Sequence, residues 1–137
     1  YDIPLVPIHM NCVVPPVPSP QHCYAFGLAV KEIIENDLPD GLRVAFMGTG
    51  GLSHDPGGPK YFDVDEEFDR WFLALLEEGD PERVLRECTM EKMVAWIAAM
   101  GAVGTRPAKT LCYEPSVALR CGMGCVYWEM EKETAHV

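Results

Sequence analysis

The order of strand, helix and strand over the first third of the chain constrains its fold more than any other feature. Residues 5–14 (LVPIHMNCVV) form a short apolar run with β-branched residues, which indicates a buried strand. Ser19 and Pro20 then provide the N-cap and the first position of a helix that we expect to extend to about Asn36. Residues 42–48 (LRVAFMG) predict a second strand. Since a connection of this length suits a crossover, we expect a βαβ unit in an α/β fold, with a mostly parallel or mixed sheet flanked by helices.

The remaining sequence predicts two more helices and a further strand. Asp63 and Glu66 form a capping-box pattern, and the apolar stripe that follows them indicates a helix. A second helical pattern covers about residues 89–100, and residues 124–130 (GCVYWEM) indicate a strand. The expected core positions of these two helices are Phe68, Trp71, Phe72, Leu75, Leu76, Met90, Met93, Val94, Ile97 and Met100.

Composition and charge are those of a globular protein, and 137 residues suffice for one domain or for half of a larger one, which we expect over residues 1–130 with a solvated tail over residues 131–137. The chain is 48% hydrophobic and 23% charged. Its formal net charge of −10 argues against nucleic-acid binding, which needs a basic surface. We find no apolar run of about 18 residues and no signal-peptide pattern. The six cysteines lack C-x-x-C and zinc-finger spacing, so we expect reduced thiols in a cytoplasmic protein.

A glycine-rich loop, residues 48–59 (GTGGLSHDPGGP), follows the second expected strand and contains one histidine, His54. A phosphate-binding loop would lead directly into a helix, whereas this loop continues into residues that oppose a helix. A plain structural turn is one interpretation, because glycine adopts positive φ at little cost. The other is catalytic, since loops at the carboxyl ends of parallel strands line ligand sites and histidine exchanges protons near neutral pH.

Residues 48–54 (GTGGLSH), preceded by the apolar VAFM, closely resemble the motif of the class III extradiol ring-cleaving dioxygenases, the family of protocatechuate 4,5-dioxygenase. Residues 6–34 are similar to that family's strand, proline-rich turn and helix, and residues 90–104 (MEKMVAWIAAMGAVG) to its helix with an acidic iron ligand. The resemblance implies a non-haem Fe(II) enzyme that cleaves a catechol-type substrate with O2. It also implies a facial triad of two histidines and one glutamate around the metal.

The resemblance points to two site residues, His54 directly and Glu91 with a mismatch of one position. His54 matches the family's acid/base histidine, which does not bind the metal. In related sequences the acidic ligand stands four residues before the helix tryptophan, whereas Glu91 stands five before Trp96 and Lys92 stands four before it. Because a lysine ammonium does not bind Fe(II), we expect Glu91 to be the ligand. The other explanation for Glu91 is an acidic residue that complements the helix dipole.

The other site residues follow less directly from the resemblance. The two iron histidines belong to the family's N-terminal half, which we expect to lie outside this chain, and we interpret His9, His22 and His136 as structural. Residues 113–125 (YEPSVALRCGMGC) fall where the family places substrate contacts. Ser116 and Arg120 are the candidates there for a substrate carboxylate or hydroxyl, the other interpretation being loop capping and surface charge.

Two functions are therefore open. The first is the C-terminal half of an Fe(II) extradiol dioxygenase catalytic subunit, which would be inactive alone. Completed by an N-terminal half or a second chain, and as part of an oligomer, it would cleave protocatechuate, gallate or a similar aromatic with O2. The alternative is a non-catalytic homologue that serves as a structural or partner subunit. A hydrolase built on Ser53 and His54 is disfavoured because no nucleophile-elbow motif is present.

A half-domain would also leave apolar surface without partners, at the edges of residues 5–14 and 42–47 and on the stripe of residues 89–100. We therefore expect that the isolated chain does not fold as a stable monomer.

Overall fold

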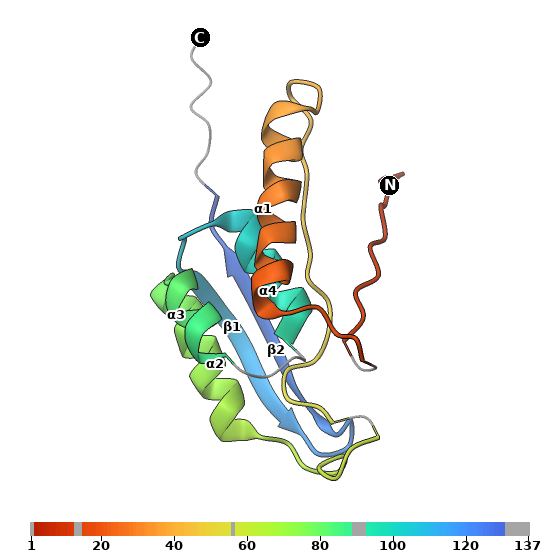
Figure 1. Ribbon diagram of the computed structural model, residues 1–137, viewed down its shortest axis with the longest axis vertical. Helices are drawn as coiled ribbons and strands as arrows, with labels where there is room; N and C mark the ends of the chain where they lie inside the picture. Colours follow the sequence, from red (N-terminus) through yellow and green to blue (C-terminus); the bar gives the residue numbers. More distant parts are fainter. Residues whose placement is uncertain (1, 13–14, 56, 89–92, 131–137) are drawn as a thin grey trace.

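Four helices and one β-hairpin form the part of the chain that the computed structural model describes, residues 2–12, 15–55, 57–88 and 93–130. Helix α1 pairs with α4, while α2 contacts both α3 and strand β1 (Figure 1). Within these described residues, we find no helix with the length and apolar character needed to cross a membrane. In chain order the elements are α1 (Pro20–Asn36), α2 (Glu66–Glu78), α3 (Pro81–Glu87), α4 (Val94–Val103), β1 (Ala108–Ser116) and β2 (Cys121–Trp128).

Helix α1 begins and ends as the sequence predicts. The Ser19 side chain accepts a hydrogen bond from the backbone N–H of His22, and Pro20 occupies the first turn. This cap satisfies a backbone donor that the first turn of a helix leaves without a partner.

Two glycines allow α1 and α4 to pack with their backbones in contact. A Cβ on Gly27 would collide with the carbonyl oxygen of Ala98, and one on Gly101 would collide with the carbonyl oxygen of Tyr24. Helix α4 is buried over most of its length because α1 covers it so closely. This helix therefore provides a fixed support for the loops that pack against it.

The sheet is a two-stranded antiparallel hairpin whose register runs from Ala108 opposite Trp128 to Ser116 opposite Cys121, with an irregularity between Thr110 and Cys112. The expected strand at residues 124–130 overlaps β2 over residues 124–128, whereas β1 was not anticipated. The core beside the hairpin is formed by buried side chains of α2, α3 and α4, including Phe72, Leu75, Leu76, Val84, Val94 and Ile97.

The expected parallel βαβ unit is wrong for this structure. The described residues of 5–14, and all of 42–48, are extended without strand pairing. A strand exists only when a neighbouring strand takes its backbone hydrogen bonds, and here no described strand lies beside either segment. The fold remains α/β in content, with one antiparallel hairpin in place of the parallel sheet.

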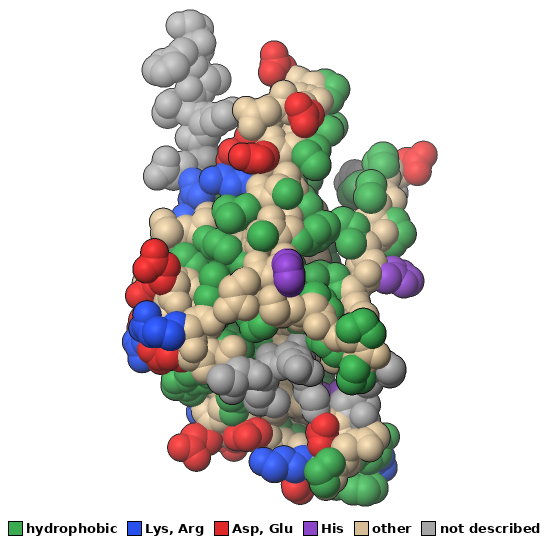
Figure 2. All heavy atoms as spheres, in the orientation of Figure 1, with side chains coloured by type: hydrophobic (Ala, Val, Ile, Leu, Met, Phe, Trp, Pro, Cys, Tyr) green, Lys and Arg blue, Asp and Glu red, His purple; other side chains and the backbone are tan. Residues whose placement is uncertain are grey.

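The prediction of uncovered apolar edges is confirmed for these two extended segments. Exposed apolar side chains line the N-terminal arm, which extends away from α1 (Figures 1 and 2). The stripe expected to be uncovered on residues 89–100 is instead buried where the structure describes it, from Met93 onward, because α1 packs against α4. The exposed large apolar residues of the two extended segments are Leu5, Val6, Ile8, Leu42, Val44 and Met47.

Two local details also differ from the prediction. Helix α2 has Asp65, not Asp63, as its N-cap, and the Asp65 carboxylate accepts from the backbone N–H of Phe68. Helix α3 was not predicted; Asp80 caps it and Pro81 opens it. No disulfide bond joins the six cysteines, all of which lie in the described residues. The expected tail over 131–137 lies outside the described residues.

Candidate functional site

Hydrogen bonds from α4 and β2 hold residues 50–53 of the glycine-rich loop in place. The indole Nε1 of Trp96 donates to the carbonyl oxygens of Gly50 and Gly51, at 3.3 Å each. The backbone N–H of Leu52 donates to the carbonyl of Gly122 at 2.8 Å, and the N–H of Gly122 donates back to the carbonyl of Ser53 at 3.2 Å. Helix α4 and strand β2 thus fix the backbone immediately before His54.

A buried carboxylate, Asp69 of α2, organises the next part of the loop. Its Oδ1 accepts from the backbone N–H of Ser53 at 2.6 Å, and its Oδ2 accepts from the Ser53 hydroxyl at 2.9 Å. The Tyr113 hydroxyl of β1 donates to the same Oδ2 at 2.8 Å. The Ser53 oxygen in turn accepts from the backbone N–H of Asp65 at 2.9 Å. Asp69 is fully buried, so these donors replace the water that its charge would otherwise require.

Gly122 and Tyr113 both accommodate the Asp69 carboxylate, one by leaving space for it and the other by donating a hydrogen bond. A Cβ on Gly122 would collide with Asp69 Oδ2, so strand β2 can pass this point only with glycine. Burial and the hydrogen bond to Asp69 raise the pKa of the Tyr113 phenol well above its ordinary value. Tyr113 therefore stays a hydrogen-bond donor throughout the physiological pH range.

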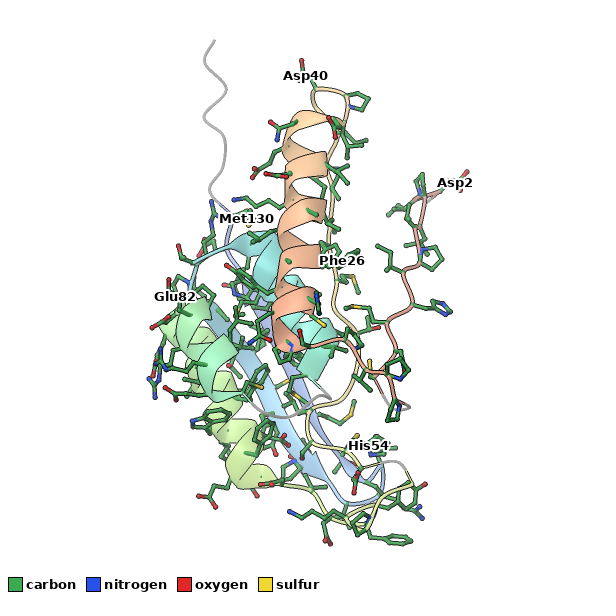
Figure 3. The ribbon with its side chains drawn as sticks, viewed as in Figure 1. Asp2, Phe26, Asp40, His54, Glu82 and Met130 are labelled. Atoms are coloured by element: carbon green, nitrogen blue, oxygen red, sulfur yellow. The ribbon has the colours of Figure 1, made fainter. Side chains whose placement is uncertain are left out.

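His54 lies directly after this fixed segment, beside the turn of the hairpin (Figure 3). Its Nδ1 lies 2.7 Å from the backbone carbonyl oxygen of Arg120, and its ring centroid lies 6.2 Å from that of Tyr61. Within the described residues, Nε2 has no hydrogen-bond partner. The imidazole is half-buried and lines a cavity of about 610 Å³. The other residues around that cavity are Ser53, Asp55, Lys60, Asp63, Val64, Asp65, Glu66 and Glu67.

The two candidate substrate residues lie at the same hairpin turn as His54. The Arg120 guanidinium lies over the rings of Tyr61 and Phe62, at 4.6 and 4.4 Å from their centroids. The Ser116 hydroxyl accepts from the backbone N–H of Leu119 at 3.3 Å, which caps the turn. Both side chains thus have structural contacts, and their contact with a substrate stays a prediction.

A metal site needs several donor side chains close together. Among the described residues, no three His, Cys, Asp or Glu side chains lie close enough together to hold a metal ion. Glu91, the expected iron ligand, lies outside the described residues, as do Lys92 and His136. His9 is exposed, and His22 is exposed with its Nδ1 3.0 Å from the Ser19 hydroxyl. The described residues therefore do not form an iron site by themselves.

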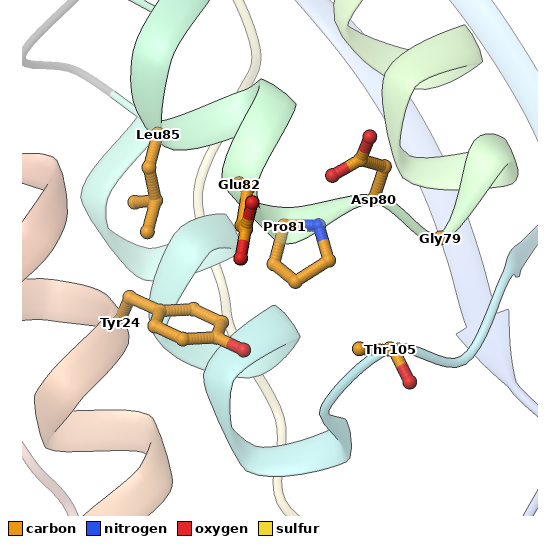
Figure 4. A pocket seen from close by; sticks show the side chains of 7 residues that line it. All are labelled: Tyr24, Gly79, Asp80, Pro81, Glu82, Leu85 and Thr105. Carbon is orange, nitrogen blue, oxygen red and sulfur yellow. The ribbon is translucent and has the colours of Figure 1, made fainter.

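A second cavity, of about 370 Å³, lies between α1 and the start of α3 (Figure 4). Burial, together with the charge of Glu82, raises the pKa of Tyr24 at its edge. Asp80, also at this cavity, accepts from the backbone N–H of Arg83 at 3.0 Å as the cap of α3. The cavity thus contains a carboxylate that already has a structural role, and none of its lining residues is shared with the His54 cavity.

Sequence reasoning missed Asp69 and the tyrosines beside the site. Asp69 had a detectable signal, because it lies three and seven residues before Phe72 and Leu76 and so shares their buried face. A charged residue at a core position of a helix is a sign of a buried polar network. Tyr61 and Tyr113 had no comparable signal, since their contacts depend on loop and hairpin geometry.

Comparison with known proteins gives consistent matches. Residues 1–119 match the family model described as the catalytic LigB subunit of aromatic ring-opening dioxygenase. The chain is 36% identical over 90 residues to a gallate dioxygenase from Pseudomonas putida, a match that covers 66% of this chain and 26% of the relative. It is 34% identical over 95 residues to a 2,3-dihydroxyphenylpropionate/2,3-dihydroxicinnamic acid 1,2-dioxygenase from Photorhabdus laumondii, covering 67% of this chain and 29% of the relative. The matched region thus spans less than a third of the length of these relatives.

Proposed function

The chain belongs to the family of catalytic LigB subunits of aromatic ring-opening dioxygenases, and on that premise we propose that it carries the acid/base histidine, His54, of an extradiol dioxygenase. The proposed reaction is cleavage of a catechol-type aromatic ring by O2, with protocatechuate, gallate or a similar compound as substrate. The observation that carries this proposal is the environment of His54. The ring follows a loop segment anchored to α2, α4 and β2, and it lines a cavity.

His54 has the chemistry that acid/base catalysis requires. A carbonyl oxygen accepts hydrogen bonds but cannot donate them, so the contact between Nδ1 and Arg120 requires a proton on Nδ1. In the neutral ring the lone pair then lies on Nε2, which takes up a proton from a catechol hydroxyl and later returns it to the opened product. Because the preceding backbone is fixed, the ring is placed before the substrate binds.

Iron is the second part of the proposal. The described residues do not form a metal site, so Fe(II) would depend on Glu91 and on two histidines outside this chain. A preceding segment or a separate chain would supply them, and we propose an oligomeric cytoplasmic enzyme. Iron content of the purified full-length protein tests this point, since Glu91→Gln should lower it well below one ion per active site while His22→Gln should not.

Activity is tested on the full-length protein with gallate, protocatechuate and 2,3-dihydroxyphenylpropionate in air-saturated buffer. We expect O2 uptake and a matching rise in absorbance of ring-opened product with at least one of them. His54→Gln should lower kcat by about 10²–10⁴-fold, the usual contribution of a general acid/base. His22→Gln is the matched control, because this exposed histidine lies in the first turn of α1.

The outcomes separate the two functions. An iron-loaded wild-type protein that consumes no O2 with any of these compounds would favour the non-catalytic homologue. An active wild-type protein whose His54→Gln variant keeps full activity would refute the assignment of His54 while leaving the dioxygenase assignment in place.

A further inference from the structure

We propose that Arg120 is the positioning residue of His54: its backbone carbonyl sets which ring nitrogen is protonated, and its side chain holds that carbonyl in place. The catalytic consequence rests on the proposed function, whereas the structural part concerns only the state of the imidazole. No motif in the sequence links the two residues, which are 66 positions apart.

The ring of His54 contacts the backbone carbonyl of Arg120 closely. Nδ1 of His54 and the carbonyl oxygen of Arg120 are 2.7 Å apart, a short distance for an N–H···O hydrogen bond. Because the oxygen can only accept, the neutral ring carries its proton on Nδ1. This is the less populated neutral tautomer of a histidine side chain in water, so the protein must impose it. The carbonyl of Arg120 is the group that does so.

Arg120 has a left-handed backbone conformation. With φ at 57°, it is the non-glycine residue with positive φ among the described residues. A side chain makes this left-handed conformation unfavourable, and glycine would adopt it without strain. The backbone N–H of Arg120 donates to the carbonyl of Val117 at 3.2 Å, which closes the turn. The conformation thus aims the Arg120 carbonyl at His54, and a side chain at this position requires a compensating contact.

The Arg120 side chain makes such a compensating contact with two aromatic rings. The Arg120 guanidinium lies over the rings of Tyr61 and Phe62, which follow shortly after the glycine-rich loop. Cation–π contacts of this kind favour arginine because its planar group stacks on aromatic faces. Tyr61 also lies beside the His54 ring. Arg120 therefore contacts this part of the chain at two places, through its carbonyl at His54 and through its guanidinium seven and eight residues further on.

This arrangement gives Arg120 a different role from the substrate contact that the sequence suggests. A guanidinium that binds a substrate carboxylate would act through its side chain alone. A positioning residue acts through its carbonyl, so its replacement changes the state of the His54 ring even when no substrate is present. The two roles therefore differ in a spectroscopic measurement on the free protein.

The test is the ring tautomer of His54 in the metal-free full-length protein, read by two-bond ¹⁵N–¹H spectra of ¹⁵N-histidine-labelled samples above the pH at which the ring loses its charge. The resonances of His54 are assigned by their loss in His54→Gln. We expect the wild-type ring to carry its proton on Nδ1. Arg120→Gly should keep this tautomer, because glycine adopts positive φ freely. Arg120→Ala keeps the strain and loses the ring contact, so the Nδ1–H form should lose population by about tenfold relative to the other form.

Arg86→Ala is the control, because this exposed arginine pairs with Glu87 on α3. It should leave the tautomer unchanged. A wild-type ring protonated on Nε2, or the same tautomer in wild type, Arg120→Gly and Arg120→Ala, would overturn the proposal. Equal increases in KM for a carboxylate-bearing substrate in both variants, with an unchanged tautomer, would assign the side chain to the substrate instead. An Nδ1–H ring in a protein without dioxygenase activity would support the positioning role and refute the proposed function.

Discussion

Removal of the Asp69 carboxylate should release the loop that carries His54. Asp69 is fully buried and accepts three hydrogen bonds from two residues, Ser53 and Tyr113. In Asp69→Ala, the backbone N–H of Ser53 loses a charged acceptor, which costs about 2 kcal/mol. The Tyr113 hydroxyl is half-buried and reaches water more easily, so it adds about 1 kcal/mol. The Ser53 hydroxyl adds less, because it keeps the Asp65 N–H as a partner.

The expected total is about 3–4 kcal/mol of local stability. Hydrogen exchange measures it directly, because the exchange rate of an amide that opens locally reports the free energy of that opening. In Asp69→Ala, the amides of Leu52 and Ser53 should exchange about 10²–10³-fold faster than in wild type, as every 1.4 kcal/mol is a factor of ten. Asp69→Asn keeps an acceptor for the Ser53 N–H, so in this variant the exchange rate of the Ser53 amide should rise only about tenfold above that of wild type.

Glu67→Gln is the matched control, since this carboxylate lies on the same helix and is exposed. Its exchange rates over residues 48–54 should equal those of wild type. If Asp69→Ala and Glu67→Gln gave the same protection of the Ser53 amide, the buried carboxylate would not be what holds the loop. The reasoning from its three hydrogen bonds would then be refuted.

Three further predictions concern packing and pH. Gly122→Ala should lower the free energy of unfolding by about 2–3 kcal/mol, because its Cβ would collide with Asp69; an unchanged urea midpoint of the full-length protein would contradict this. Gly27→Ala should cost a similar amount by pushing α1 away from the Ala98 carbonyl of α4, and a loss of near-ultraviolet circular dichroism would report the altered packing. Tyr113 should ionise at higher pH than an ordinary tyrosine, because burial and Asp69 raise its pKa. Its hydrogen bond therefore contributes stability below about pH 10, the pKa of an unfolded tyrosine, and loses that contribution as the pH rises through the higher folded pKa. In a near-ultraviolet absorbance titration, Tyr113→Phe should remove the component that ionises last, and a titration curve that keeps this component would refute the assignment.

Helix positions were predictable because their signals are local. Ser19 and Pro20 mark the start of α1 through the backbone donors of its first turn, and the apolar stripes mark the buried faces of α2 and α4. The cap of α2 was misplaced by two residues because Asp63 and Asp65 are both acceptable capping residues by sequence. Helix α3 was missed because its seven residues give little periodicity.

The candidate site was predictable in part. Its motif identified His54 and the family, since glycines, a serine and a histidine in that order are visible in the sequence. Asp69 was visible only as a polar residue on an apolar face, and nothing local marked Tyr61 or the backbone of Arg120. Their contacts join segments far apart in the chain, as in the 66-residue separation of His54 and Arg120.

The sequence by itself determined the regions of α1, α2 and α4, which of their faces are apolar and which histidine lies in the glycine-rich loop, because these depend on neighbours within a few residues. Only the tertiary structure decided that residues 5–14 and 42–48 remain without strand pairing where they are described, since a strand needs a partner for its backbone hydrogen bonds. It also placed Nδ1 of His54 2.7 Å from the carbonyl oxygen of Arg120, a residue of a distant turn, and the proposed tautomer rests on that contact. Side-chain identity gives histidine its ability to exchange protons, whereas the folded backbone determines which ring nitrogen lies against an acceptor.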